Sequence, residues 1–221
     1  MVARSATSFG TALIILLMCW TALAAAKEFV PPRTFHAKTY PARDEHANEK
    51  VTIAADPYDL ADKAAVFKTK YRDYGFLPLQ LIISNDGDQP IALTQIKLEL
   101  VTVERVKIAP ANTEDLYRRM SKLKRRGDEP QKIPLPLPRK KSVGGIEKET
   151  AQEIESAQFH AMAVEPHSTQ SGFFFFDVAD IPNPLAGARL YVSGVRDEKG
   201  GELMYFEIAL EKYLNYRPGK P

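Results

Sequence analysis

The stretch FLPLQLIISNDGDQPIAL, residues 76–93, decides the fold of this chain. Its first half has apolar residues at every second position, the pattern of a β-strand with one face in a core: Leu77, Leu79, Leu81 and Ile83. The sequence Asn-Asp-Gly-Asp at 85–88 is typical of a tight hairpin turn, because Asn and Gly tolerate the positive φ that such turns require. A second strand pattern starts at Pro90 and changes phase, so we expect a bulge or bend near residues 94–95.

A second stretch, SGFFFFD at 171–177, carries four consecutive phenylalanines. A strand that is apolar on both faces is typical of the middle of a sheet, so we expect this run to form a central strand. Shorter strand patterns occur at 50–54, 160–164, 188–194 and 202–210. The last two flank a glycine-containing turn, which predicts a closing hairpin.

Helical patterns lie between these two groups of strands. Asn112 is typical of a helix N-cap, and an apolar stripe at helical spacing follows it: Leu116, Tyr117, Met120 and Leu123. Gly127 is expected to end this helix. The prolines within 129–138 predict an extended connector, and a second, acidic helix is expected from about 146 to 159.

Short strands on both sides of a helical, proline-containing insertion predict a mainly β fold, an antiparallel β-sandwich with an enlarged mid-chain loop. The stretches at 76–93 and 171–177 also resemble the secreted bacterial Ig-like β-sandwich domains of uncharacterised envelope proteins. Those domains pair a strand ending in Asn-x-x-x-x-Pro with a later strand that opens in Gly, aromatic residues and an acid. The resemblance covers about 50–110 and 160–212, implies an Ig-like sandwich and brings no catalytic residues.

Residues 1–26 have the pattern of a secretory signal peptide, with Arg4 before an uncharged apolar run and Ala-x-Ala sequences near the end. The most apolar part, 13–20, is well short of the ~20 residues that cross a bilayer. Cleavage near Ala25 or Lys27 is therefore favoured over a retained anchor. We expect the exported chain in the periplasm or cell envelope, and not as an integral membrane protein.

The expected organisation of the chain has four parts. These are the signal peptide at 1–26, an extended polar arm at 27–49, an Ig-like β-sandwich at 50–212 with the insertion 111–159, and a C-terminal tail at 213–221. The single cysteine, Cys19, lies within the signal, so the exported chain contains no disulfide and is stabilised by packing. Lipid attachment at Cys19 is disfavoured because the bulky Met18 precedes it.

Positive charge is concentrated in one segment of the chain. Residues 118–141 contain ten basic and two acidic residues, a net charge of +8, which favours an anionic envelope component or an acidic protein as partner. The candidate partner-binding residues are Arg118, Lys122, Arg125, Arg139, Lys140 and Lys141. Nucleic acid is not expected, because export removes it and the segment has almost no aromatic residues for base stacking.

The alternative for this basic segment is neutralisation within the insertion. The second expected helix carries four glutamates that would face it: Glu147, Glu149, Glu153 and Glu155. In that interpretation the basic residues have a structural role and bind no partner.

No sequence pattern specifies a cofactor or metal site, and we expect neither. The four histidines are not spaced to share a helix face: His36, His46, His160 and His167. Two weaker alternatives are a zinc site of His36 and His46 with Asp44 or Glu45, and a calcium site at 85–88.

Catalytic patterns are equally weak. His167, Ser168 and Asp177 supply the residue types of a nucleophilic triad, but a Gly-x-Ser-x-Gly motif is absent. The leading interpretation is a non-catalytic, exported interaction or structural module. The alternative is an exported hydrolase with a site near His160 and His167.

Overall fold

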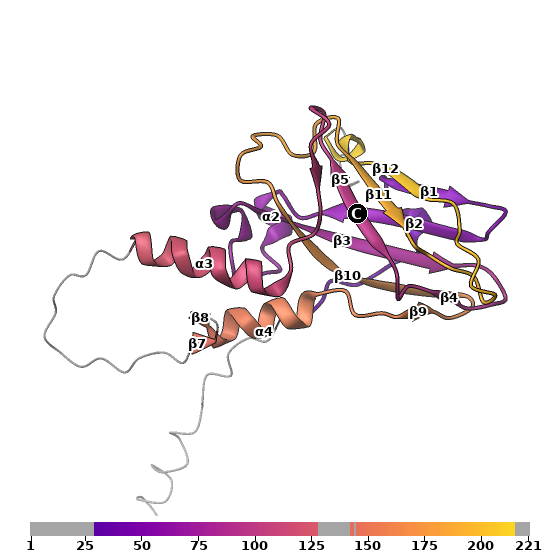
Figure 1. Ribbon diagram of the computed structural model, residues 1–221, viewed down its shortest axis with the longest axis horizontal. Helices are drawn as coiled ribbons and strands as arrows, with labels where there is room; N and C mark the ends of the chain where they lie inside the picture. The colour runs from indigo at the N-terminus through magenta and orange to yellow at the C-terminus, as the bar shows by residue number, and fades with distance from the viewer. Residues whose placement is uncertain (1–28, 128–141, 144, 215–221) are drawn as a thin grey trace, which may run out of the picture.

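The computed structural model describes residues 29–127, 142–143 and 145–214 (Figure 1). The expected signal peptide at 1–26 and the proline-rich connector at 129–138 lie outside the described residues. Within the described part, the protein is mainly β with antiparallel sheets. In that same part, no helix combines the length and the apolar character needed to cross a bilayer.

Two four-stranded antiparallel sheets form the body of the molecule. The first has the order β1-β2-β3-β10 and comprises β1 (Arg43–His46), β2 (Val51–Pro57), β3 (Phe76–Asn85) and β10 (Ser168–Asp177). The second has the order β12-β11-β5-β6 and comprises β12 (Phe206–Ala209), β11 (Arg189–Ser193), β5 (Lys97–Val101) and β6 (Lys107–Ile108). We call them the β3 sheet and the β11 sheet.

The remaining elements are short strands and helices. Two-residue strands pair β4 (Ile91–Ala92) with β9 (Ala163–Val164), and β7 (Ser142–Val143) with β8 (Ile146–Glu147). The α-helices are α2 (Ala61–Ala64), α3 (Thr113–Gly127) and α4 (Lys148–Ala157), and the 3₁₀ helices are η1 (Ala37–Thr39), η2 (Tyr71–Tyr74) and η3 (Leu210–Tyr213). Figure 1 shows α3 and α4 at the same end of the sheets.

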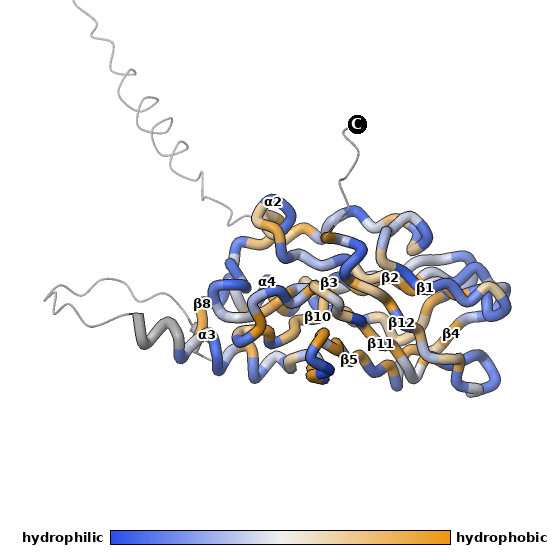
Figure 2. The backbone as a smooth tube through the Cα atoms, turned by 90° about the horizontal axis from the view of Figure 1, so that it is seen from above, coloured by the Kyte–Doolittle hydropathy of each residue, from blue (hydrophilic) through white to orange (hydrophobic). Residues whose placement is uncertain are grey.

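The two sheets share one hydrophobic core. The apolar residues predicted at alternate positions of β3 all contribute to it, together with β11 and β12 residues such as Leu190 and Phe206. All ten residues of β3 are buried, because its second face is covered as well. Figure 2 shows hydrophobic residues gathered along the strands and hydrophilic ones along the loops.

A second, aromatic-rich core covers the outer face of the β3 sheet. Phe173 and Phe175 of β10 pack there against α3, α4 and the 58–71 segment, whereas Phe176 faces the core between the sheets. The Phe67 ring lies 4.9 Å from the Phe173 ring, edge to face. The prediction that the phenylalanine run is apolar on both faces is therefore confirmed.

The prediction that this run is a central strand is wrong, because β10 lies at the end of the β3 sheet. Its open edge is covered by the two ends of the insertion. The Ala111 N–H donates to the Phe175 carbonyl (2.8 Å), and the Phe159 N–H donates to the Phe173 carbonyl (3.2 Å). Gly172 permits this approach, since a Cβ there would lie 2.5 Å from the Phe159 Cα.

The predicted hairpin at 85–88 is also wrong. Both edges of β3 are occupied, by β2 on one side and β10 on the other, so the chain after the turn crosses to the β11 sheet. The Asn85 side chain forms the turn by accepting the Gly87 N–H at 2.9 Å. The expected bend at 94–95 is confirmed, because it separates β4 from β5 and the Ile96 N–H donates to the Leu93 carbonyl.

The segment 27–49, for which the sequence predicted no regular element, contributes η1 and β1. Strand β1 pairs with β2 throughout, from Arg43 opposite Ala54 to His46 opposite Val51. The two predicted helices of the insertion are present as α3 and α4, and the predicted final hairpin is present as β11 and β12.

Candidate interaction surface

Helix α3 carries three of the six basic residues that the sequence singled out, namely Arg118, Lys122 and Arg125. Its first turn is capped as predicted, since the Asn112 side-chain oxygen accepts the Asp115 N–H at 2.8 Å. Leu116 and Met120 are buried in the aromatic-rich core. Because residues three and four apart share a helix face, this anchoring leaves Arg118 and Lys122 together on the exposed side.

A hollow of about 700 Å³ lies beside this exposed side of α3. Its lining combines charged residues of α3 and β10 with apolar residues of β3 and the 109–111 segment: Asp115, Arg118, Arg119, Lys122, Asp177, Phe76, Ala109, Pro110 and Ala111. We call this surface the α3 hollow. It lies where the chain leaves the edge of the β11 sheet and reaches the edge of β10.

The three cations of the α3 hollow have different surroundings. Arg119 forms an ion pair with Asp177 of β10, and its guanidinium lies 5.8 Å from the centre of the Phe76 ring. Arg118 pairs with Asp115 one turn earlier on α3. Lys122 is exposed and, among the described residues, has no ion-pair partner.

The structure thus brings Arg118 and Lys122 together, as the helix periodicity predicted. The side chain of Arg125 and the residues Arg139, Lys140 and Lys141 lie outside the described part. Sequence reasoning did not select Arg119, because its partner Asp177 is 58 residues away and no local pattern connects them.

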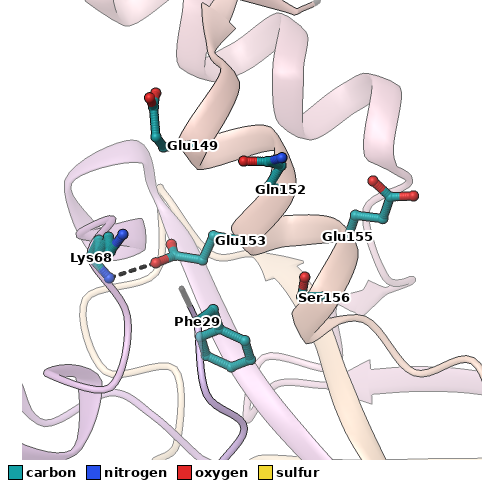
Figure 3. A pocket seen from close by; sticks show the side chains of 7 residues that line it. All are labelled: Phe29, Lys68, Glu149, Gln152, Glu153, Glu155 and Ser156. Carbon is teal, nitrogen blue, oxygen red and sulfur yellow. Dashed lines mark hydrogen bonds between the residues drawn. The ribbon is translucent and has the colours of Figure 1, made fainter. Parts of the chain in front are cut away.

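Among the described side chains, Arg118 and Arg119 pair with Asp115 and Asp177, and not with the glutamates of α4. Glu153 is buried and bound elsewhere, to the 68–71 segment (Figure 3). Its carboxylate accepts the N–H groups of Lys68 (2.6 Å) and Thr69 (3.2 Å) and the Tyr71 hydroxyl (2.9 Å). Burial, and then the charge of Glu153, raise the pKa of Tyr71 well above its usual range.

A second cleft, of about 470 Å³, opens along α4 (Figure 3). Glu149 and Glu155 line it together with Phe29 and Lys68. The acidic residues of α4 therefore line a cleft separate from the α3 hollow, and the two surfaces have opposite charge.

The two histidines of the alternative hydrolase do not converge. His160 is exposed and its Nε2 lies 2.7 Å from the Glu155 carbonyl oxygen, next to the Phe159 contact with Phe173. His167 is exposed and precedes the first residue of β10. The strand from 168 to 173 alone spans roughly 17 Å.

The triad residue types are equally separated. Ser168 and Asp177 are the first and last residues of β10, so roughly 30 Å of strand lies between them. The Ser168 hydroxyl donates to the Glu165 carbonyl at 2.8 Å. The structure assembles no nucleophile, base and acid from these three residues.

The histidines of the N-terminal segment take structural roles. His36 Nε2 lies 2.8 Å from Asp86 Oδ1. His46 stacks on Phe206 of the other sheet, with ring centroids 3.9 Å apart, and its Nδ1 lies 2.7 Å from Glu49. Within the described ranges, no group of three or more His, Cys, Asp or Glu residues is arranged to hold a metal ion.

The side chains that would bind calcium at 85–88 are also engaged in other contacts. The Asn85 amide is turned inward and donates to the Gln89 and Val164 carbonyls. Asp86 pairs with Lys38, and Asp88 pairs with Lys50, and in each case this contact is the main cause that lowers the carboxyl pKa.

Comparison with known proteins returned no match, either to a family model or to a curated protein.

Proposed function

We propose that this protein is a non-catalytic module of the cell envelope or periplasm that binds an anionic partner through the α3 hollow. We further propose that its two sheets form an Ig-like β-sandwich. The signal-peptide pattern at 1–26 supports export, and the shared core of two antiparallel sheets, with the motifs at 76–93 and 171–177, supports the fold.

The α3 hollow is the observation that carries the proposal. Arg118, Arg119 and Lys122 line one concave surface, and Lys122 has no anionic partner among the described residues. Concave sites with a few charged groups and an apolar lining are the usual form of ligand sites in proteins. An anionic envelope component or an acidic protein has the charge that this surface accepts.

The binding test uses the chain from Lys27 onward. It is titrated with polyglutamate, an acidic polysaccharide, phosphatidylglycerol vesicles and neutral phosphatidylcholine vesicles, at low and at physiological salt. We expect binding to at least one polyanion that weakens as salt rises, because exposed charges are screened over about 8 Å at physiological ionic strength. Absence of binding to every polyanion at low salt would overturn the proposal.

Export has a separate test. N-terminal sequencing of the protein from the envelope fraction should begin at Ala25 or Lys27. An intact Met1 in a membrane pellet would contradict cleavage and favour a retained anchor.

A further inference from the structure

The α3 hollow has two kinds of wall. One wall is the cationic face of α3, and the other is apolar, formed by Ala109, Pro110 and Ala111 together with Phe76. A flat anionic surface such as a lipid bilayer would reach only the rim of a concave site. A chain with both carboxylates and an apolar side chain can contact both walls at once.

Arg119 is already positioned at the inner side of the hollow. Asp177 pairs with it through Oδ2, while the other oxygen of Asp177 accepts the Ala179 N–H at 3.2 Å. The Phe76 ring lies under the guanidinium. Because both neighbours are fixed by the sheet, the orientation of this cation is set before any ligand arrives, which lowers the entropy cost of binding.

Arg118 and Lys122 stand one helical turn apart on the outer rim. The Arg118 side chain is 67% exposed although it pairs with Asp115, so a ligand carboxylate can reach it. Exposed ion pairs of this kind are weak and exchange partners at little cost.

We infer that the α3 hollow binds an extended acidic segment of another protein, with one apolar side chain over residues 109–111 and carboxylates on Arg118 and Lys122. The inference rests on the proposed function and adds the chemistry of the partner. An apolar side chain buried there contributes affinity that a purely charged polymer lacks.

The test compares two dye-labelled peptides by fluorescence anisotropy. One has glutamates around a central leucine, and the other has glycine in place of the leucine. The leucine peptide should bind about tenfold more tightly, the effect of burying most of one apolar side chain. In Ala109→Trp, which fills the hollow from an exposed position, the two peptides should bind equally.

Charge variants complete the design. The double variant Arg118→Glu/Lys122→Glu should lose binding of both peptides. The matched control Lys97→Glu/Lys199→Glu makes the same change in net charge away from α3 and should keep binding. Lys97 begins β5 at the end opposite its pairing with β6. Lys199 lies in the turn that follows Arg196, which pairs with Ala92 of β4 at the end of the sheets opposite α3 (Figure 1).

Each contrary outcome identifies which statement fails. If the wild-type protein binds the two peptides with equal affinity, the inference of an acidic segment with an apolar side chain over residues 109–111 is overturned. The proposed anion-binding function would remain. Binding of phosphatidylglycerol vesicles without either peptide overturns the inference in favour of a membrane surface. If no polyanion, vesicle or peptide binds, both proposals fall.

Discussion

The hydroxyl of Tyr71 donates to the buried carboxylate of Glu153, at 2.9 Å and 82 residues apart in sequence. This contact fastens α4 to the 68–71 segment over the outer face of the β3 sheet. Two backbone N–H groups complete the site, so the charge of Glu153 has hydrogen-bond donors although its side chain is buried. Buried carboxylates are tolerated when they are satisfied in this way.

Alkaline pH should destabilise the protein through its buried tyrosines. Burial raises the pKa of Tyr71, and the Glu153 charge adds to this effect, so Tyr71 stays neutral in the folded state after it ionises in the unfolded state near pH ~10. Its stabilising contribution is complete below that pH and is lost as pH rises above it. The expected slope is about 1.4 kcal/mol per pH unit for each such group.

The measurement is urea unfolding of the wild type and Tyr71→Phe between about pH 8 and pH 11. Tyr71→Phe should be less stable near neutrality, because Glu153 loses a donor, and should show a shallower loss of stability above pH ~10. Identical slopes for the two proteins would contradict a buried Tyr71 hydroxyl.

The aromatic-rich core should depend on Phe175. Phe175 is 1% exposed and packs beside Tyr71, with ring centroids 4.7 Å apart. Phe175→Ala should lower the free energy of unfolding by about 3–5 kcal/mol, through lost transfer energy and a cavity. Phe174→Ala is the control, since Phe174 is only partly buried and should cost less. A loss below ~1 kcal/mol for Phe175→Ala in denaturant melting would show that this core is not formed.

Gly172 should be required for covering the edge of β10. An alanine Cβ would overlap the Phe159 backbone, so Gly172→Ala should displace the end of the insertion at a cost of about 1–3 kcal/mol. Hydrogen exchange should accelerate at the Phe159 amide, which bonds to Phe173. Gln170→Ala, on the same strand, should leave that exchange unchanged. Equal protection of the Phe159 amide in both variants would contradict the close approach of Phe159 to Gly172.

Local sequence patterns predicted the strands and helices of this fold better than they predicted which strands pair with one another. The alternation in β3 and the cap at Asn112 depend on residues close in sequence, and both are present as expected. The turn sequence at 85–88 indicated that the chain reverses direction after β3, but not which strand pairs with β3. That pairing depends on β10, which takes the free edge of β3 about 90 residues later.

The candidate surface was predictable to a similar degree. Helical spacing placed Arg118 and Lys122 on one face, whereas the position of Arg119 depends on Asp177 and Phe76 in distant strands. In the sequence, Glu153 is one of four glutamates that would face the basic segment if the insertion neutralised itself. It is buried because the 68–71 segment supplies its donors, and no local pattern encodes such a long-range contact.

Charge reversal on α3 tests the central claim most directly. The triple variant Arg118→Glu/Lys122→Glu/Arg125→Glu is compared with the wild type for polyglutamate binding and for melting temperature. We predict that binding is lost and the melting temperature is nearly unchanged, because Arg118 and Lys122 are exposed and an exposed ion pair such as Arg118–Asp115 contributes only about 0–1 kcal/mol to folding. Unchanged binding together with a stability loss of several kcal/mol would contradict the account, and would show that this basic face packs against the protein itself.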